Sequence, residues 1–137
     1  MTETKLPADE LIDSLQESET YSVKVLDMDA VILSFNKSGY KHMEVDDPKT
    51  ILGRNWLSYW KDEADTKAKA AFEKARKGRI GYFEGQRMTE KGTPKWWEVT
   101  VVPLKNDVHD VQWILVMSRD VTELHALRKE LATLKAK

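Results

Sequence analysis

The sequence predicts an α+β domain in which helices cover one face of an antiparallel sheet. Two apolar or alternating stretches near the start are followed by short helical segments and one longer helix, and three further strands come last. Strands at both ends with helices between them are typical of an antiparallel sheet of this class. The 137 residues suffice for one ordinary domain with helical extensions.

The composition excludes several classes of function. The chain has no cysteine, which rules out disulfides, thiolate metal sites, cysteine nucleophiles and cysteinyl cofactor adducts. Its 22 Lys and Arg residues balance 23 Asp and Glu residues, so we expect neither a nucleic-acid partner nor a membrane partner. No run approaches the ~18 apolar residues of a membrane span, and no signal peptide is visible near Met1, so we expect a cytoplasmic protein.

Three segments divide the chain. Residues 1–19 are polar apart from a narrow apolar stripe that includes Leu11 and Leu15, and we expect them to form an amphipathic N-terminal helical cap. Residues 20–119 form the body of the domain. Residues 120–137 form a charged tail with regularly spaced leucines, which predicts a helix.

The body begins with two strands. Residues 21–26 alternate apolar and polar side chains, as a half-buried strand does, and the β-branched run 30–35 is expected to pair with it as a hairpin. Residues 36–45 look helical or irregular. The segment 47–53 predicts a small helix, and the alanine-rich segment 62–77 predicts a longer helix with one apolar face.

Three strands follow at residues 80–89, 95–104 and 111–119. In the second of them, alternate positions form a wholly apolar face, which we expect to point at the core: Trp97, Val99 and Val101. In the last strand both faces are largely apolar, with Ile114, Val116 and Ser118 on one side and Trp113, Leu115 and Met117 on the other. The second face must therefore be covered by the N-terminal helix, the C-terminal helix or a second copy of the chain.

Three motifs together resemble PAS sensor domains. They are the segments 51–56 (ILGRNW), 97–104 (WEVTVVPL) and 118–123 (SRDVTE), in the right order and at domain-sized spacing, and the similarity covers roughly residues 20–125. The resemblance implies a PAS fold: a five-stranded antiparallel sheet in the spatial order 2-1-5-4-3, with helices on one face enclosing a pocket and flanking helices at both ends. It also implies a role in signalling proteins such as histidine kinases and transcription regulators.

The same resemblance implies a ligand pocket between the sheet and the helices. We expect the following lining residues: Phe35, Trp56, Phe83, Arg87, Trp97, Val99, Val101, Ile114, Val116 and Ser118. Arg87 could clamp a carboxylate or phosphate, or stack on an aromatic ring; alternatively it reaches solvent or pairs with an acidic neighbour. Tyr59 and Trp60 either line the pocket or roof it. A further alternative is that the large tryptophans simply fill the interior.

The sequence does not identify a cofactor, and one alternative is that the domain binds none. Light-sensing flavin members of the family carry a cysteine where this chain has Trp56, so their thiol adduct cannot form, and two bulky tryptophans disfavour flavin mononucleotide. A dinucleotide flavin remains an alternative, because some redox-sensing members hold it without cysteine. Haem-binding members of the family usually take an axial histidine from the long helix. Haem is therefore disfavoured here, because the 62–77 helix has no histidine and His42 could only serve by a different geometry. The scattered histidines predict no metal site.

The C-terminal segment predicts an output helix. Asp120 can cap it and Glu123 completes a capping box, and the resemblance implies a relay through Asp120, Thr122 and Glu123. The spacing of three, four and three residues from Leu124 through Leu127 and Leu131 to Leu134 fits a and d positions of two heptads. We expect a parallel coiled coil in a homodimer, assisted by Leu11, Leu15, Trp113, Leu115 and Met117. The alternative is a helix folded back on its own sheet.

The predicted function is therefore that of a sensory or regulatory module. It would sense a small molecule or redox state and relay it through the C-terminal helix to an output such as a histidine kinase, on a longer chain or in trans. The alternative is a ligand-free dimerisation and signal-coupling module. An enzyme is not expected, because the sequence shows no acid–base pair, phosphate-binding loop or catalytic triad.

Overall fold

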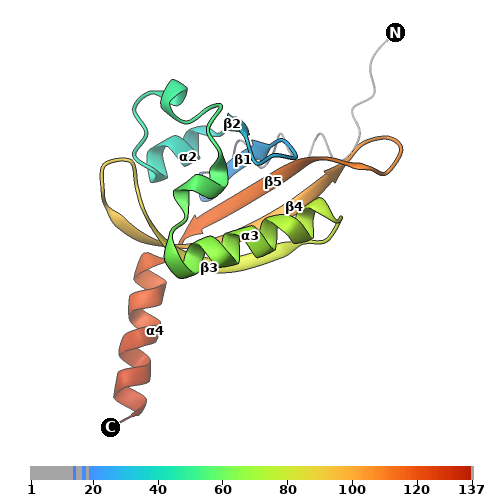
Figure 1. Ribbon diagram of the computed structural model, residues 1–137. Coiled ribbons are helices and arrows are strands. Elements are labelled where there is room, and N and C mark those ends of the chain that lie inside the picture. Colours follow the sequence, from blue (N-terminus) through green and yellow to red (C-terminus); the bar gives the residue numbers. More distant parts are fainter. Residues whose placement is uncertain (1–13, 15–16, 18, 137) are drawn as a thin grey trace.

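The computed structural model describes residues 14, 17 and 19–136 (Figure 1). The elements are β1 (Ser22–Leu26), β2 (Ile32–Phe35), α2 (Lys37–His42), the 3-10 helices η1 (Pro48–Thr50) and η2 (Trp56–Tyr59), α3 (Asp62–Arg76), β3 (Gly81–Met88), β4 (Pro94–Lys105), β5 (Val111–Asp120) and α4 (Thr122–Lys135). Most of the predicted N-terminal helical cap (residues 1–19), including Leu11 and Leu15, lies outside the described residues.

The five strands form one antiparallel sheet in the order β2-β1-β5-β4-β3. Helix α3 lies across β3, β4 and β5, while α2 and the 3-10 helices gather over the β1–β2 end on the same face of the sheet (Figure 1). The α+β class and the predicted strand order are confirmed. No helix in the described part of the chain has the length and apolar character needed to cross a membrane.

Helix α3 packs closely on the edge strand β3. Its alanine-rich face is buried, with Ala68 and Ala75 fully shielded from solvent. Gly81 makes this approach possible, because a Cβ at that position would lie 2.4 Å from the carbonyl oxygen and 2.7 Å from the Cα of Ala71. Any larger residue would force the helix away from the strand.

The segment 47–53 forms a shorter helix than the sequence predicts. Only Pro48–Thr50 is helical, as a single 3-10 turn. The predicted end signals are in place, since the Asp47 carboxylate accepts a hydrogen bond from the Lys49 N–H and Gly53 has φ +85°. The remaining residues turn toward β2, where the Gly53 N–H donates to the Ile32 carbonyl at 2.8 Å.

Strand β1 is not half-buried, which corrects the expectation from its alternation. Ser22 and Lys24 are 0% and 2% exposed and share the helix-covered face with Leu26, because they pair with Ser118 and Val116 of β5. Val23 occupies the other face and is also fully buried. A strand inside a sheet, buried on both faces, does not display the polar-out pattern on which the prediction relied.

The faces of β4 and β5 agree with the prediction. Trp97, Val99 and Val101 are at most 1% exposed and point toward the helices. The second face of β5 is apolar and unevenly covered, since Trp113 is 38% exposed but Leu115 only 3%. This face therefore combines a buried portion with an open aromatic side chain.

Helix α4 projects away from the domain body (Figure 1). The four leucines with heptad spacing, Leu124, Leu127, Leu131 and Leu134, are 38–60% exposed. The alternative in which this helix folds back onto its own sheet is therefore not the arrangement in this structure.

Candidate functional site

Most of the predicted pocket residues lie in one packed core between the sheet and the helices. The core includes Phe35, Trp56, Phe83, Trp97, Val99, Val101, Ile114 and Val116, each at most 8% exposed. Ser118, 4% exposed, faces the same interior beside Val99. Trp56, Trp60 and Phe83 contact one another edge to face, with ring centroids 5.0 to 6.2 Å apart. Aromatic rings thus occupy much of the space that the resemblance assigned to a ligand.

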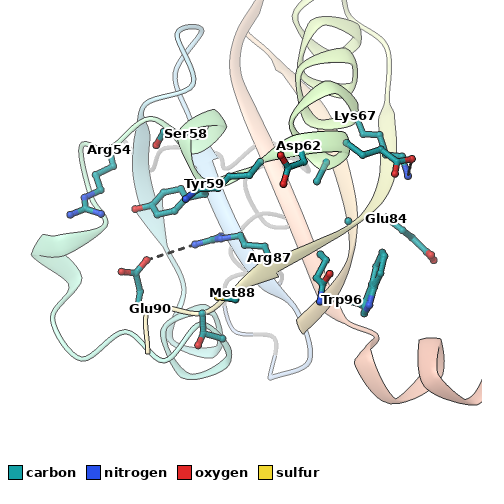
Figure 2. Close-up of a pocket in the computed structure, with 16 residues that line it drawn as sticks. Arg54, Ser58, Tyr59, Asp62, Lys67, Glu84, Arg87, Met88, Glu90 and Trp96 are labelled. Carbon is teal, nitrogen blue, oxygen red and sulfur yellow. Dashed lines mark ion pairs between the residues drawn. The ribbon is translucent and has the colours of Figure 1, made fainter. Parts of the chain in front are cut away.

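A partly open cavity of about 740 Å³ lies beside this core (Figure 2). Its walls come from η2, the beginning of α3, and strand β3 with the turn that follows it. Among the predicted lining residues, Arg87 faces this cavity, together with Tyr59 and Glu90. Figure 2 shows the Arg87 side chain extending from β3 toward these two residues.

Arg87 is a buried cation at the inner wall of the cavity. It is 8% exposed, and its guanidinium carbon lies 4.2 Å from the centroid of the Tyr59 ring and 5.9 Å from that of Trp60. Its Nη2 is 3.8 Å from the Glu90 carboxylate, which is an ion pair beyond hydrogen-bond distance. Burial lowers the pKa of Arg87 to about 10, so the side chain stays protonated at neutral pH. Arg87 therefore both stacks on the Tyr59 ring and pairs with an acidic neighbour, Glu90.

Gly85 allows the Trp60 ring to lie close to Arg87. A Cβ at this position would lie 3.1 Å from the Ala64 Cβ and 3.2 Å from Cζ3 of Trp60, tighter than most real contacts. Because glycine leaves this space free, Trp60 can approach β3 next to Arg87.

A second cation, Lys24, faces the interior from β1. Its Nζ lies 4.3 Å from the centroid of the Phe35 ring and donates a hydrogen bond to the Ser22 hydroxyl at 3.3 Å. None of the ion pairs among the described residues includes Lys24. Burial, and secondarily the charge of Arg87, hold the pKa of Lys24 well below its ordinary value. Sequence reasoning missed this residue, because Lys24 alternates with Val23 and Val25 as an exposed side chain of a half-buried strand does.

Three aromatic side chains of this region also carry buried hydrogen-bond donors without acceptors among the described residues. The Trp56 Nε1, the Trp60 Nε1 and the Tyr59 hydroxyl are all buried and find no partner within the described part of the protein. Buried polar atoms in folded proteins nearly always have a partner. Indole N–H groups can only donate, so what this region lacks is acceptors.

The joint between β5 and α4 differs from the predicted capping box. Asp120 ends β5, and Val121, which has no capping side chain, occupies the N-cap position of α4. The Asp120 carboxylate instead accepts hydrogen bonds from the Thr122 hydroxyl at 2.6 Å and from the Thr122 N–H at 3.0 Å. Glu123, the other half of the predicted box, is exposed. The strand continues one residue further than expected, which moves the cap.

This joint is fastened to β4. The Trp96 N–H donates to the Thr122 hydroxyl at 2.9 Å, and the Val121 N–H donates to the Trp96 carbonyl at 2.8 Å. The indole of Trp96 stacks on the His125 ring with centroids 3.9 Å apart. Backbone, hydroxyl and ring contacts thus fix the first turn of α4 to the sheet.

Lys95 completes the joint on the interior side of β4. Its Nζ lies 3.2 Å from the Asp120 carboxylate and donates to the His42 carbonyl at 3.1 Å. Burial alone would raise the pKa of Asp120, but the hydrogen bonds from Thr122 and the Lys95 ammonium outweigh it and lower the pKa below its ordinary value. Asp120 therefore stays ionised and keeps α4 connected to β4 and α2.

The interior does not fit a flavin ring system. Trp56 and Trp97, the two largest of the fully buried side chains, are 0% and 1% exposed and pack where the resemblance would place the ring. Trp97 in addition donates its indole N–H to the Arg87 carbonyl at 3.2 Å, which ties it to β3. Among the described residues, no group of three histidine, aspartate or glutamate side chains could hold a metal ion.

Solved structures of low sequence identity share this fold. An RNA-binding light-oxygen-voltage receptor matches with a TM-score of 0.78 and 18% identity, over 99% of this chain and 40% of the receptor, so this chain spans less than half of it. A light-oxygen-voltage domain studied with a flavin analogue has a TM-score of 0.74 and 16% identity, over 93% and 96% of the two chains. The PAS domain of an HTR-like protein from Haloarcula marismortui has a TM-score of 0.60 and 21% identity, over 82% and 90%.

No curated protein matches the sequence. A family model does match: the model described as PAS fold covers residues 20–126, which include the whole sheet, the packed core, the cavity wall and the joint to α4. The chain therefore belongs to the PAS family, whose domains generally serve as sensory signalling modules rather than as catalysts.

Proposed function

We propose that this chain is a sensory PAS module in which a small molecule shifts the packing beside the core and α4 carries that shift to an output domain such as a histidine kinase. The observation that supports this most is the fastening of α4 to β4 by Thr122 and Trp96. Exchange of a few polar contacts at the junction of two elements is one of the ways in which proteins switch between two arrangements.

The interior and the joint meet on β4. Trp97 lies in the core, while its neighbours in sequence, Lys95 and Trp96, contact Asp120 and the first turn of α4. A displacement of Trp97 along or across β4 therefore moves the groups that hold α4. The proposal needs only a population shift between two helix positions, for which a coupling free energy of about 1–3 kcal/mol suffices.

We further propose that α4 pairs with α4 of a second copy of the chain. The four leucines at a and d positions form one exposed stripe on a helix that projects from the body (Figure 1). A repeat of this kind is complementary to itself in a parallel coiled coil. Two heptads are marginal on their own, so the open part of the second sheet face around Trp113 is proposed to contribute.

A ligand-free coupling module is the second candidate. The packed aromatic core favours it, since the predicted pocket residues contact one another rather than surround a space. In that case the input would be a mechanical change from a neighbouring domain, and the joint to α4 would work in the same way.

Amide hydrogen exchange tests the relay without knowledge of the ligand. Trp97→Phe removes the indole N–H that reaches the Arg87 carbonyl and leaves space in the core. We expect several-fold faster exchange in the first turn of α4, measured relative to β1 and β5. Phe72→Leu on α3 is the matched control, because Phe72 is 3% exposed in the same core but is not part of β4.

The outcome of the comparison decides the proposal. At an equal loss of global stability, α4 should respond to Trp97→Phe and not to Phe72→Leu. Equal acceleration in both variants, or an α4 that ignores the Trp97 substitution, would contradict a relay through β4.

A further inference from the structure

We propose that the cavity beside Arg87 binds a small organic carboxylate, whose oxygens replace the Glu90 carboxylate at the guanidinium. This inference rests on the proposed sensory function, for which it names the class of ligand. It starts from an imbalance in the site: the buried guanidinium of Arg87 takes part in none of the hydrogen bonds among the described residues, and it lies beside the buried Tyr59 hydroxyl, which also finds no partner there.

The guanidinium is available to an incoming anion. Arg87 has five N–H donors, and none of the side-chain hydrogen bonds within the described residues uses them. Glu90, its ionic partner among the described residues, stays at 3.8 Å, too far for the bidentate contact that an arginine fork makes with a carboxylate. Glu90 therefore offsets the charge of Arg87 but leaves its hydrogen-bonding capacity unused.

The Tyr59 hydroxyl supplies a further donor. It is buried and has no partner in the described part of the chain, while the Tyr59 ring packs against the guanidinium at 4.2 Å. Both residues line the cavity, and Figure 2 shows them together at one end of it, with Glu90 on the same side. A planar anion at this end could accept from both groups.

The cavity can admit such a molecule from solvent. About 740 Å³ is enough for a small organic acid, and the remaining walls carry both charges, with Asp62 and Glu84 against Lys67 and Arg54. This mixed rim provides no second buried cation, which favours a singly charged carboxylate over a phosphate. The Tyr59 ring, which lines the cavity beside Arg87, favours an aromatic or apolar body on the acid.

Through Glu90, binding of a ligand at Arg87 would also affect the turn that leads into β4. It sits in the turn between β3 and β4, and its N–H donates to the Met43 carbonyl at 3.0 Å. When a ligand carboxylate takes the guanidinium, the Glu90 side chain loses its ion-pair partner. The turn that leads into β4 is thereby released at the strand that also holds Trp97 and the α4 joint.

Titration of the full chain with sodium benzoate, followed through the tryptophan indole N–H signals by NMR, tests the proposal. Benzamide has the same shape without the charge, and inorganic phosphate is the third arm. We expect saturable shifts with benzoate and none with benzamide or phosphate. Binding of benzamide equal to benzoate would overturn the carboxylate assignment, and so would saturation by phosphate alone.

Variants then connect binding to the named side chains. Arg87→Met should abolish benzoate binding, and Tyr59→Phe should weaken it about fivefold to tenfold through loss of one hydrogen bond. Lys69→Met, on the same helix but outside the cavity lining and with its side chain 61% exposed, should change affinity by less than about twofold.

The Glu90→Gln variant provides a second test, whose outcome does not depend on whether Arg87→Met folds. Removing the internal competitor should tighten benzoate binding several-fold, an effect that misfolding cannot produce. Unchanged or weaker binding in Glu90→Gln overturns the displacement. If benzoate fails to bind while Trp97→Phe still alters α4, the ligand class is wrong and the relay stands.

Discussion

Trp97 and Asp120 face each other directly across β4 and β5. Trp97 is 1% exposed within the core, whereas Asp120 accepts two hydrogen bonds from Thr122 at the start of α4. One cross-strand pair therefore has a member in the interior and a member in the helix joint. A change in the packing of Trp97 can therefore act directly on Asp120, because the two residues are paired on neighbouring strands.

The first prediction concerns the hydroxyl at the joint. Thr122→Val removes the group that accepts from the Trp96 N–H and donates to Asp120, with almost no change of shape. We expect a loss of about 1 kcal/mol in the free energy of unfolding and faster amide exchange in the first turn of α4. Thr133→Val is the control, since the Thr133 hydroxyl contacts only the Lys129 carbonyl of its own helix among the described hydrogen bonds. Equal effects of the two substitutions would argue against an anchoring role.

The second prediction concerns the buried amine. Lys24→Met keeps the volume of the side chain and removes a cation that burial disfavours, so it should stabilise the protein by about 1–3 kcal/mol at neutral pH. Chemical denaturation measures the difference. The exposed Lys37, substituted in the same way, should leave stability nearly unchanged. A destabilised Lys24→Met variant would mean that the ammonium is held by interactions stronger than its burial cost.

The pH dependence of the same variant follows from the direction of the pKa shift. Because the folded-state pKa of Lys24 lies below the unfolded-state value near 10.5, the unfolded chain binds an extra proton between the two values. The free-energy cost of burying the Lys24 ammonium is therefore fully present below the folded-state pKa of Lys24, and it disappears as the pH rises toward 10.5. The advantage of Lys24→Met should shrink over that window, and a gap that widens with pH would contradict the assignment.

The third prediction concerns the contact of α3 with β3. Gly81→Ala places a Cβ against the Ala71 backbone at 2.4 Å, so we expect a loss of about 2–3 kcal/mol. Gly92→Ala meets no atom within 4 Å and suffers only from its φ of +85°, for which about 1 kcal/mol is expected. Thermal unfolding ranks the two variants, and the reverse order would show that α3 can move away from the sheet at little cost.

The fourth prediction concerns the leucine stripe of α4. If two chains pair through it, light scattering after gel filtration should report a dimer for the natural sequence and a monomer for Leu127→Arg. Ala126→Arg adds the same charge to an exposed position beside the stripe and should remain dimeric. A natural chain that is monomeric at all concentrations would remove the proposed pairing.

The sheet could be predicted because its signals are local. Alternation of Trp97, Val99 and Val101 identifies the inner face of β4 without any knowledge of its neighbours, and the structure confirms it. Lys24 shows where this logic ends. Its polarity suggests an exposed position, but its place on an inner strand buries it, and only the pairing with Val116 reveals the face on which it lies.

The site could be predicted only in part, because tertiary packing creates it. The resemblance implies that Arg87 on β3 faces an interior, and the structure buries its side chain beside Tyr59 and Glu90. The cavity, however, joins η2, the start of α3 and the turn with Glu90, which no sequence pattern places together. The shifted cap of α4 has a similar origin, since pairing of Asp120 with Trp97 prolongs β5 by one residue.

A double-mutant comparison of Trp97→Phe and Thr122→Val tests the coupling of core and helix most directly. Amide exchange in the first turn of α4 would be measured in both single variants and in the double variant, relative to β1. If the core acts on α4 through the joint, Trp97→Phe should accelerate this exchange in the natural background and add nothing once Thr122 is valine. Additive effects of the two substitutions would show that core and joint are independent, and the relay proposed here would be contradicted.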